Sequence, residues 1–100
     1  MFIAIVDFHV TSANQPVAFE ILAGDQAEAG RIPGNLGFRV FSDAQSATHV
    51  GLMHQWASQS AFDAYLASPG FAQVAAKLGP MMTGAPVSRR FEATLYETVR

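Results

Sequence analysis

The chain contains no cysteine, only 14% charged residues and no run of basic residues. Without cysteine it has no disulfide, no thiolate nucleophile and no cysteine ligand for a metal. The histidines His9, His49 and His54 do not have the His-x-x-x-His spacing of a helical zinc site, so we expect no metal site. The six lysines and arginines are scattered and the formal net charge is −2, so we expect no nucleic-acid partner.

The chain also has no long uninterrupted apolar run. Its first ten residues, MFIAIVDFHV, are apolar but carry no basic n-region and are interrupted by Asp7 and His9. We therefore expect neither a secretion signal nor a membrane span, and we expect a cytoplasmic protein. A chain of 100 residues has room for one hydrophobic core, so we expect a single domain over residues 1–100.

Half of the residues are hydrophobic, and their spacing predicts alternating strands and helices. Ser58 and Ser68 are suitable helix N-caps, because a serine hydroxyl accepts a hydrogen bond from an unpaired amide of the first turn. The order β-α-β-β-α-β predicts a ferredoxin-like α+β fold, an antiparallel sheet with its helices on one face. The predicted strands are Phe2 to Val10, Leu36 to Phe41, Thr48 to Trp56 and Val87 to Val99, and the predicted helices are Gln15 to Gly30, one after Ser58, and one after Ser68 that ends at Gly79 and Pro80.

The first strand predicts a sheet with both faces buried. One face is wholly apolar and the other is mixed; the two sets are Phe2, Ala4, Val6, Phe8 and Val10, and Ile3, Ile5, Asp7 and His9. Helices on one face would leave an apolar patch of roughly several hundred Å² on the other, which is uncommon in a monomer. We therefore expect a homodimer that packs sheet against sheet.

The segment HQWASQSAFDAYLASPGF, His54 to Phe71, joins a strand end that carries a tryptophan to two capped helices. With this element order, the chain resembles the antibiotic biosynthesis monooxygenase family. By motif, the resemblance is carried by Trp56, Ser58, Ala61, Phe62, Leu66, Ser68 and Phe71. It implies a dimeric α+β barrel with a pocket between helices and sheet, and often a cofactor-independent oxygenation of quinol-like or polycyclic aromatic molecules. Haem-degrading enzymes, isomerases and degradation enzymes also belong to this family, so function varies more than fold.

The chain departs from two patterns of that family. Quinol-oxidising relatives have Glu-x-Trp at the strand end and two helical histidines, where this chain has His54, Tyr65 and Gly70. Haem-degrading relatives hold the haem with an asparagine, a tryptophan and a histidine, where this chain has Asp7, Tyr65 and Ala75. Because Ala75 offers no axial ligand, we expect no haem, and we expect no other cofactor.

A cofactor-free oxygenase needs a base, because loss of a proton makes its substrate a better electron donor to oxygen. We predict His54 as that base, since its ordinary pKa of about 6.5 lies close to working pH, with Asp7 as a second candidate if burial raises its basicity. Tyr65 and the indole of Trp56 are predicted to donate hydrogen bonds to a developing oxyanion. The predicted substrate contacts are Trp56, Leu52, Phe62, Phe71, His9 and Met81 or Met82.

Plainer roles exist for the same residues. Trp56 also suits a packing anchor, and Asp7 would be explained by pairing with Arg39, Arg89 or Arg90 across strands. Two functional hypotheses follow: a cofactor-independent monooxygenase, or a non-catalytic dimer that binds a small hydrophobic molecule or another protein. The sequence does not separate these from an isomerase or a signal-degrading enzyme on the same fold.

Overall fold

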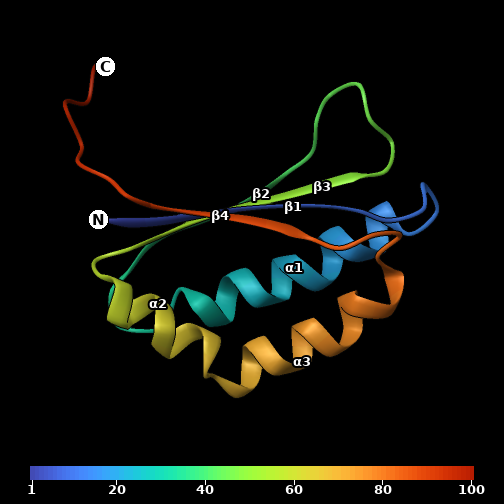
Figure 1. Ribbon diagram of the computed structural model, residues 1–100, viewed down its shortest axis with the longest axis horizontal. Helices are drawn as coiled ribbons and strands as arrows, with labels where there is room; N and C mark the ends of the chain where they lie inside the picture. The colour runs from blue at the N-terminus through green and yellow to red at the C-terminus, as the bar shows by residue number, and fades with distance from the viewer.

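A computed structural model describes residues 1–100. It contains a four-stranded antiparallel sheet, ordered β2-β3-β1-β4, with its helices on one face (Figure 1). The strands are β1 (Phe2–His9), β2 (Asn35–Phe41), β3 (His49–Trp56) and β4 (Val87–Glu92), and the helices are α1 (Gln15–Ala29), α2 (Gln59–Leu66) and α3 (Pro69–Leu78), followed by a 3-10 turn, η1 (Gly79–Met81). The predicted ferredoxin-like α+β fold is confirmed. None of the helices has the length and apolar character needed to cross a bilayer.

Both predicted serine caps are formed. The Ser58 hydroxyl accepts a hydrogen bond from the Ala61 amide at 3.2 Å, and the Ser68 hydroxyl accepts one from the Phe71 amide at 3.2 Å. Each cap satisfies an amide that has no partner within the helix. The two caps therefore set where α2 and α3 begin, and so which side chains of these helices turn toward the sheet.

The last strand is shorter than the sequence predicted: it ends at Glu92 and does not reach Val99. β4 is an edge strand whose only partner is β1, and Glu92 already lies opposite Phe2, the first residue of that partner. Met1 and Ala93 exchange two more backbone hydrogen bonds, at 2.6 and 2.8 Å. Beyond this point the chain has no strand to pair with, so it leaves the sheet toward the C terminus (Figure 1).

The strand register decides which side chains face the helices. Ala4 lies opposite His54 and Asp7 lies opposite Gly51 in the β1–β3 pair. Because successive side chains of a strand point to opposite faces, Asp7 and His54 are on opposite sides of the sheet. The face with Ala4 and His54 is the buried one, and its core includes Phe2, Phe8, Phe38, Val50, Leu52 and Trp56.

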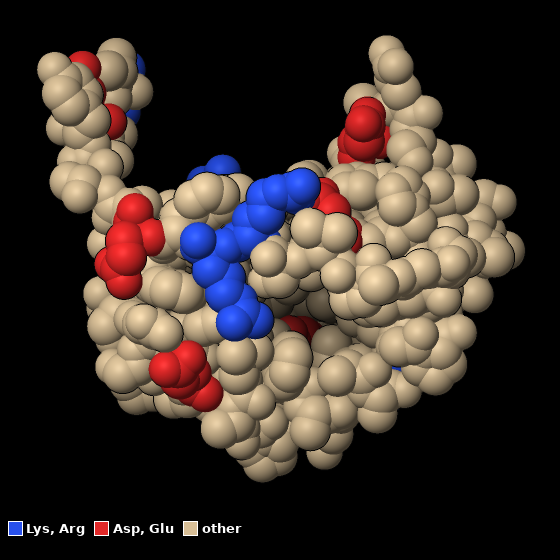
Figure 2. All heavy atoms as spheres, in the orientation of Figure 1, with Lys and Arg blue, Asp and Glu red and all other residues tan.

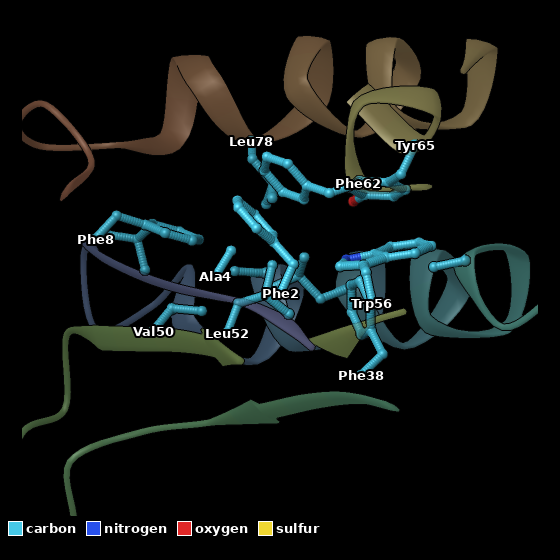
Figure 3. Packing of buried hydrophobic residues seen from close by; sticks show 14 residues of the cluster. Phe2, Ala4, Phe8, Phe38, Val50, Leu52, Trp56, Phe62, Tyr65 and Leu78 are labelled. Atoms are coloured by element: carbon cyan, nitrogen blue, oxygen red, sulfur yellow. The ribbon is translucent and has the colours of Figure 1, made fainter. Parts of the chain in front are cut away.

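Aromatic side chains join the sheet to α2 (Figure 3). The Phe2 and Phe62 rings lie 4.9 Å apart, and the Trp56 and Tyr65 rings lie 5.3 Å apart. The Tyr65 ring also meets Phe71 of α3 at 5.2 Å. Each such pair adds about 0.5–1.5 kcal/mol to the stabilisation that burial provides. These contacts hold α2 against one end of the sheet, with Tyr65 over β3.

Candidate functional site

A largely apolar cavity of about 690 Å³ lies between the sheet and the helices. Its walls include Leu52 of β3, Phe62 of α2 and Phe71 of α3, as the sequence predicted. The cavity reaches the edge strand β4, where Ser88 and Arg90 line it. Figure 2 shows a hollow in this face of the molecule, with acidic atoms at its bottom and basic side chains at its rim. A cavity of this size and polarity suits a small organic molecule.

Three of the predicted substrate contacts, Trp56, Met81 and His9, do not line this cavity. Trp56 is fully buried and does not line the cavity, because its indole packs between β3 and Tyr65. Met81 belongs to the 3-10 turn, and its neighbour Met82 lines the cavity in its place. Trp56 therefore lies behind the cavity wall, where it packs against Tyr65 and holds the His54 ring.

Asp7 and His9 are also outside the cavity, because they point to the open face of the sheet. The Asp7 carboxylate accepts a hydrogen bond from His49 Nε2 at 2.7 Å and lies 3.7 Å from the Arg89 guanidinium. His9 is exposed and its ring Nδ1 lies 3.0 Å from the Thr48 hydroxyl. The cross-strand pairing considered for Asp7 is thus present, and neither residue can contact a molecule bound on the helix side.

His54 is buried in the cavity wall and its ring is held by the indole of Trp56. Trp56 Nε1 donates a hydrogen bond to His54 Nδ1 at 2.8 Å. Burial, and to a smaller extent the positive charge of Arg90, lower the pKa of His54 from 6.5 to about 4. The imidazole is therefore neutral at pH 7. Since Nδ1 accepts a hydrogen bond, the proton of the neutral ring is on Nε2.

This arrangement alters what His54 can do. Nε2 of His54 makes no hydrogen bond within the protein. Every fully buried side-chain nitrogen and oxygen does have a hydrogen-bond partner, so Nε2 is not fully buried and is accessible from the cavity that His54 lines. In the neutral ring this nitrogen is a donor. His54 thus offers an N–H group to a bound molecule, whereas the sequence had predicted a base.

Tyr65 lines the cavity, but its hydroxyl donates a hydrogen bond to Asp25 Oδ2 at 2.6 Å. Burial and the neighbouring carboxylate raise the pKa of Tyr65, so the phenol stays protonated. Burial also raises the pKa of Asp25, while the hydrogen bond from Tyr65 opposes that rise. The hydroxyl proton of Tyr65 is therefore committed to Asp25 and is not free for the predicted oxyanion.

Asp25 was not identified from the sequence, although it is only 3% exposed and lines the cavity. The signal was present in its position on α1. The buried residues of this helix are Ala18, Leu22, Asp25 and Ala29, which follow one another at i, i+4, i+7 and i+11. A carboxylate on an otherwise apolar helical stripe is costly unless it has a partner. This conflict identifies Asp25 as a candidate functional residue, and in the structure its partner is Tyr65.

Arg90 supplies the positive charge of the cavity. Its guanidinium carbon lies 4.9 Å from the centre of the Phe62 ring, within the range of a cation–π interaction. Figure 2 shows basic side chains gathered beside the hollow. A bound anion would therefore meet a cation on the β4 side and the His54 N–H group on the β3 side.

The cavity has no side chain at residue 75 that could bind a haem iron. Ala75, which stands where haem-degrading relatives have a histidine, lines the cavity and offers no ligand atom. The chain also contains no group of three or more His, Asp or Glu residues placed to hold a metal ion.

Comparisons with known proteins identify the family. The family model for antibiotic biosynthesis monooxygenases matches residues 1–77, so the chain belongs to this family. No curated protein shows a significant sequence match to it.

Solved structures confirm the fold at low sequence identity. A candidate antibiotic biosynthesis monooxygenase from Deinococcus radiodurans has 19% identity and a TM-score of 0.89, over 100% of this chain and 99% of that chain. Another from Nitrosomonas europaea has 16% identity and a TM-score of 0.89, over 95% of this chain and 100% of that chain. A conserved protein from Methanosarcina mazei has 12% identity and a TM-score of 0.86, over 94% of both chains.

Proposed function

We propose that this chain is a cofactor-independent monooxygenase that oxidises a quinol-like or polycyclic aromatic molecule in the apolar cavity. Membership of the antibiotic biosynthesis monooxygenase family supports a monooxygenase-like role. The observation that carries the finer proposal is the cavity itself: about 690 Å³ of mostly apolar space that contains an N–H donor on His54, a cation on Arg90 and the Asp25–Tyr65 pair. Apolar walls with a few fixed polar groups suit a flat aromatic molecule that carries oxygen substituents.

The chemistry needs no external reductant for such a substrate. An anthrone, for example, has an acidic CH₂ group opposite a carbonyl, and oxygenation by O₂ converts that CH₂ group into a second carbonyl and releases one water. Removal of a proton turns the substrate into an electron-rich anion, which donates an electron to O₂ more readily. The His54 N–H group and Arg90 stabilise the oxyanion that forms, because both line the largely apolar cavity in which it would be bound.

Oxygen uptake with a panel of hydroquinones and anthrones tests this proposal. His54→Ala should lower kcat at least tenfold, because alanine offers no hydrogen-bond donor at the Nε2 position, while the matched control His9→Ala, exposed on the open face, should leave it unchanged. A folded wild-type protein that takes up no oxygen with any substrate would instead favour the non-catalytic small-molecule-binding dimer. Visible absorption from flavin or haem in the purified protein would contradict the cofactor-free chemistry.

We also propose that the protein is a homodimer, with the open sheet faces packed together. Large apolar side chains support this: Phe41, Val87 and Phe91, all on strands of the sheet, are 41%, 46% and 45% exposed. Phe91 lies opposite Ile3, so the two form part of one apolar surface on the face away from the helices.

Light scattering at micromolar concentration should give twice the 10.7 kDa subunit mass. Phe91→Glu should shift this mass toward the monomer, because it places a charge in an apolar interface. The control Val17→Glu changes a side chain on α1 that is equally exposed, at 45%, and should leave the dimer intact. A monomeric wild-type mass would refute the dimer without touching the proposed chemistry.

A further inference from the structure

A second hollow meets the apolar cavity at Asp25. This groove, of about 570 Å³, runs between α1 and α3, and Asp25, Tyr65 and Val74 line both spaces. The groove is polar where the cavity is apolar; its side chains include Glu20, Glu28, Gln73 and Lys77. Asp25 therefore lies where the apolar cavity adjoins a polar groove at the surface.

Only one oxygen of the Asp25 carboxylate is occupied. Oδ2 accepts the hydrogen bond from Tyr65, and Oδ1 has no hydrogen-bond partner. Since no fully buried side-chain oxygen lacks a partner, Oδ1 keeps contact with the space of the cavity or the groove. His54 cannot serve as the base in its neutral form, because Nδ1 is occupied by Trp56 and Nε2 carries the proton. Asp25 is then the one acidic side chain that lines the apolar cavity.

We propose that Asp25 is the catalytic base of this site, and that the proton it takes from the substrate leaves through the groove between α1 and α3. The proposal rests on the proposed function for its substrate class, an aromatic molecule with an acidic C–H or O–H group. In the first step that C–H or O–H bond breaks, its electron pair stays on the substrate, and a new O–H bond forms at Oδ1. Asp25 becomes a neutral carboxylic acid. Water in the groove then accepts the proton, which restores the carboxylate.

The surroundings of Asp25 suit this task. Burial raises the pKa of Asp25 and the negative charge of Glu28 acts in the same direction, so the carboxylate is a stronger base than an exposed aspartate. Tyr65 opposes the rise through its hydrogen bond. The other charged or titratable groups that line the two spaces are Glu20 on α1, His54 on β3, Lys77 on α3 and Arg90 on β4.

Proton exchange without oxygen isolates this step. Anthrone is incubated with the protein in D₂O under anaerobic conditions, and the loss of its CH₂ signal is followed by NMR. The wild-type protein should accelerate exchange, and Asp25→Asn should lower that acceleration at least tenfold, because the amide keeps the shape of the side chain but is not a base. The control Asp63→Asn removes an exposed carboxylate of α2 that lines neither space and should have no effect. Exchange by Asp25→Asn at the wild-type rate, or no acceleration by the wild-type protein, overturns the proposal.

Tyr65→Phe gives a second test that does not depend on Asp25→Asn being folded. Exchange requires the carboxylate form, so its rate should fall as pH drops through the pKa of Asp25. The hydrogen bond from Tyr65 lowers that pKa, so its removal should move the acid limb of the profile to higher pH. A purely structural role for the Asp25–Tyr65 pair would lower the rate without moving the limb, and that result would contradict the proposal.

The route of the proton through the groove between α1 and α3 is tested at Gly24. This residue lines the groove and not the apolar cavity. A Cβ atom at this position meets nothing within 4 Å, so larger side chains fit without a clash. Gly24→Leu should fill part of the groove and lower the exchange rate at least threefold, while Gly24→Ala should leave it unchanged. Equal rates for both variants would overturn the route.

The exchange and uptake measurements separate the two proposals. Wild-type exchange that Asp25→Asn lowers, without oxygen uptake by either protein, would retain Asp25 as the base and reject the monooxygenase. Oxygen uptake by Asp25→Asn at the wild-type rate would retain the monooxygenase and reject Asp25.

Discussion

The same residue types have different surroundings on the two faces of the sheet. His49 and His54 belong to one strand, β3, yet they point to opposite sides. On the open face, His49 Nε2 lies 2.7 Å from the Asp7 carboxylate, and the Arg89 guanidinium is also close. On the helix side, His54 has an indole as its hydrogen-bond partner and apolar walls around it, and its pKa falls to about 4. Charge on the open face meets an opposite charge, whereas charge on the helix face is suppressed by burial.

The two aspartates repeat this contrast. The Asp7 side chain is 35% exposed and lies between a histidine and an arginine, so its carboxylate is part of an ordinary cross-strand ion-pair group. Asp25 is 3% exposed and has only the hydroxyl of Tyr65 as its partner. An ionised group is costly in such a place, and groups with perturbed pKa values in cavities are concentrated at functional sites. The contrast points to the helix face as the reactive one.

The largest expected effect concerns packing on the two faces. Phe62→Ala should reduce the free energy of unfolding by about 3–5 kcal/mol, because Phe62 is 2% exposed between Phe2 and His54. In the monomeric Phe91→Glu background, Phe41→Ala, on the open face and 41% exposed within one subunit, should cost less than half as much. Denaturant titration of both variants measures the difference. An equal cost would break the comparison, since it would mean that the open face is as fully covered as the helix face.

The pH dependence of stability should reveal the buried histidine. The folded pKa of His54 is about 4, below its ordinary 6.5, so between these values the unfolded chain binds a proton that the folded chain does not. Stability from this residue is therefore complete above pH 6.5 and is lost as pH falls toward 4, by about 3 kcal/mol in total.

Urea unfolding of the wild-type protein and His54→Gln between pH 4 and 7 measures this loss. Other carboxylates titrate in both proteins, so the difference between the two curves isolates His54. Parallel curves would show that His54 is not buried in its neutral form.

The smallest effect is expected at Asp7. Asp7→Asn should lower the free energy of unfolding by less than about 1 kcal/mol, because partly exposed ion pairs contribute little. It should leave anthrone exchange and oxygen uptake unchanged, in contrast to Asp25→Asn, because Asp7 cannot reach the cavity. Thermal unfolding and the two activity assays check this. A tenfold loss of uptake in Asp7→Asn would mean that the reactive face has been assigned wrongly.

The fold was predictable because its signals are local. Period-two alternation in β1, the serine caps of α2 and α3 and the element order each follow from residues that are neighbours in the sequence. The end of β4 was not predictable from its own residues. Leu95 and Val99 suit a strand, but the length of β4 depends on where β1 begins, since a strand needs a partner.

The site was predicted only in part. Leu52, Phe62 and Phe71 line the cavity because their apolar positions repeat at the period of a strand or a helix, which the sequence displays. Trp56 and Asp7 were assigned to the site because of the chemistry of their side chains. That chemistry does not indicate whether a side chain lines the cavity, lies behind its wall or points to the other face of the sheet. Asp25 was overlooked because the residue that makes its burial possible, Tyr65, is 40 positions away in the sequence.

The sequence by itself determined the order of strands and helices, the caps that begin two of them, and the alternation that makes one sheet face apolar. These depend on backbone geometry and on residues within a few positions of each other. Only the tertiary structure decided the β1–β3 register, which separates Asp7 from His54 by the thickness of the sheet. It also brought Tyr65 to Asp25 and Trp56 to His54, and burial in those pairs sets which groups hold protons.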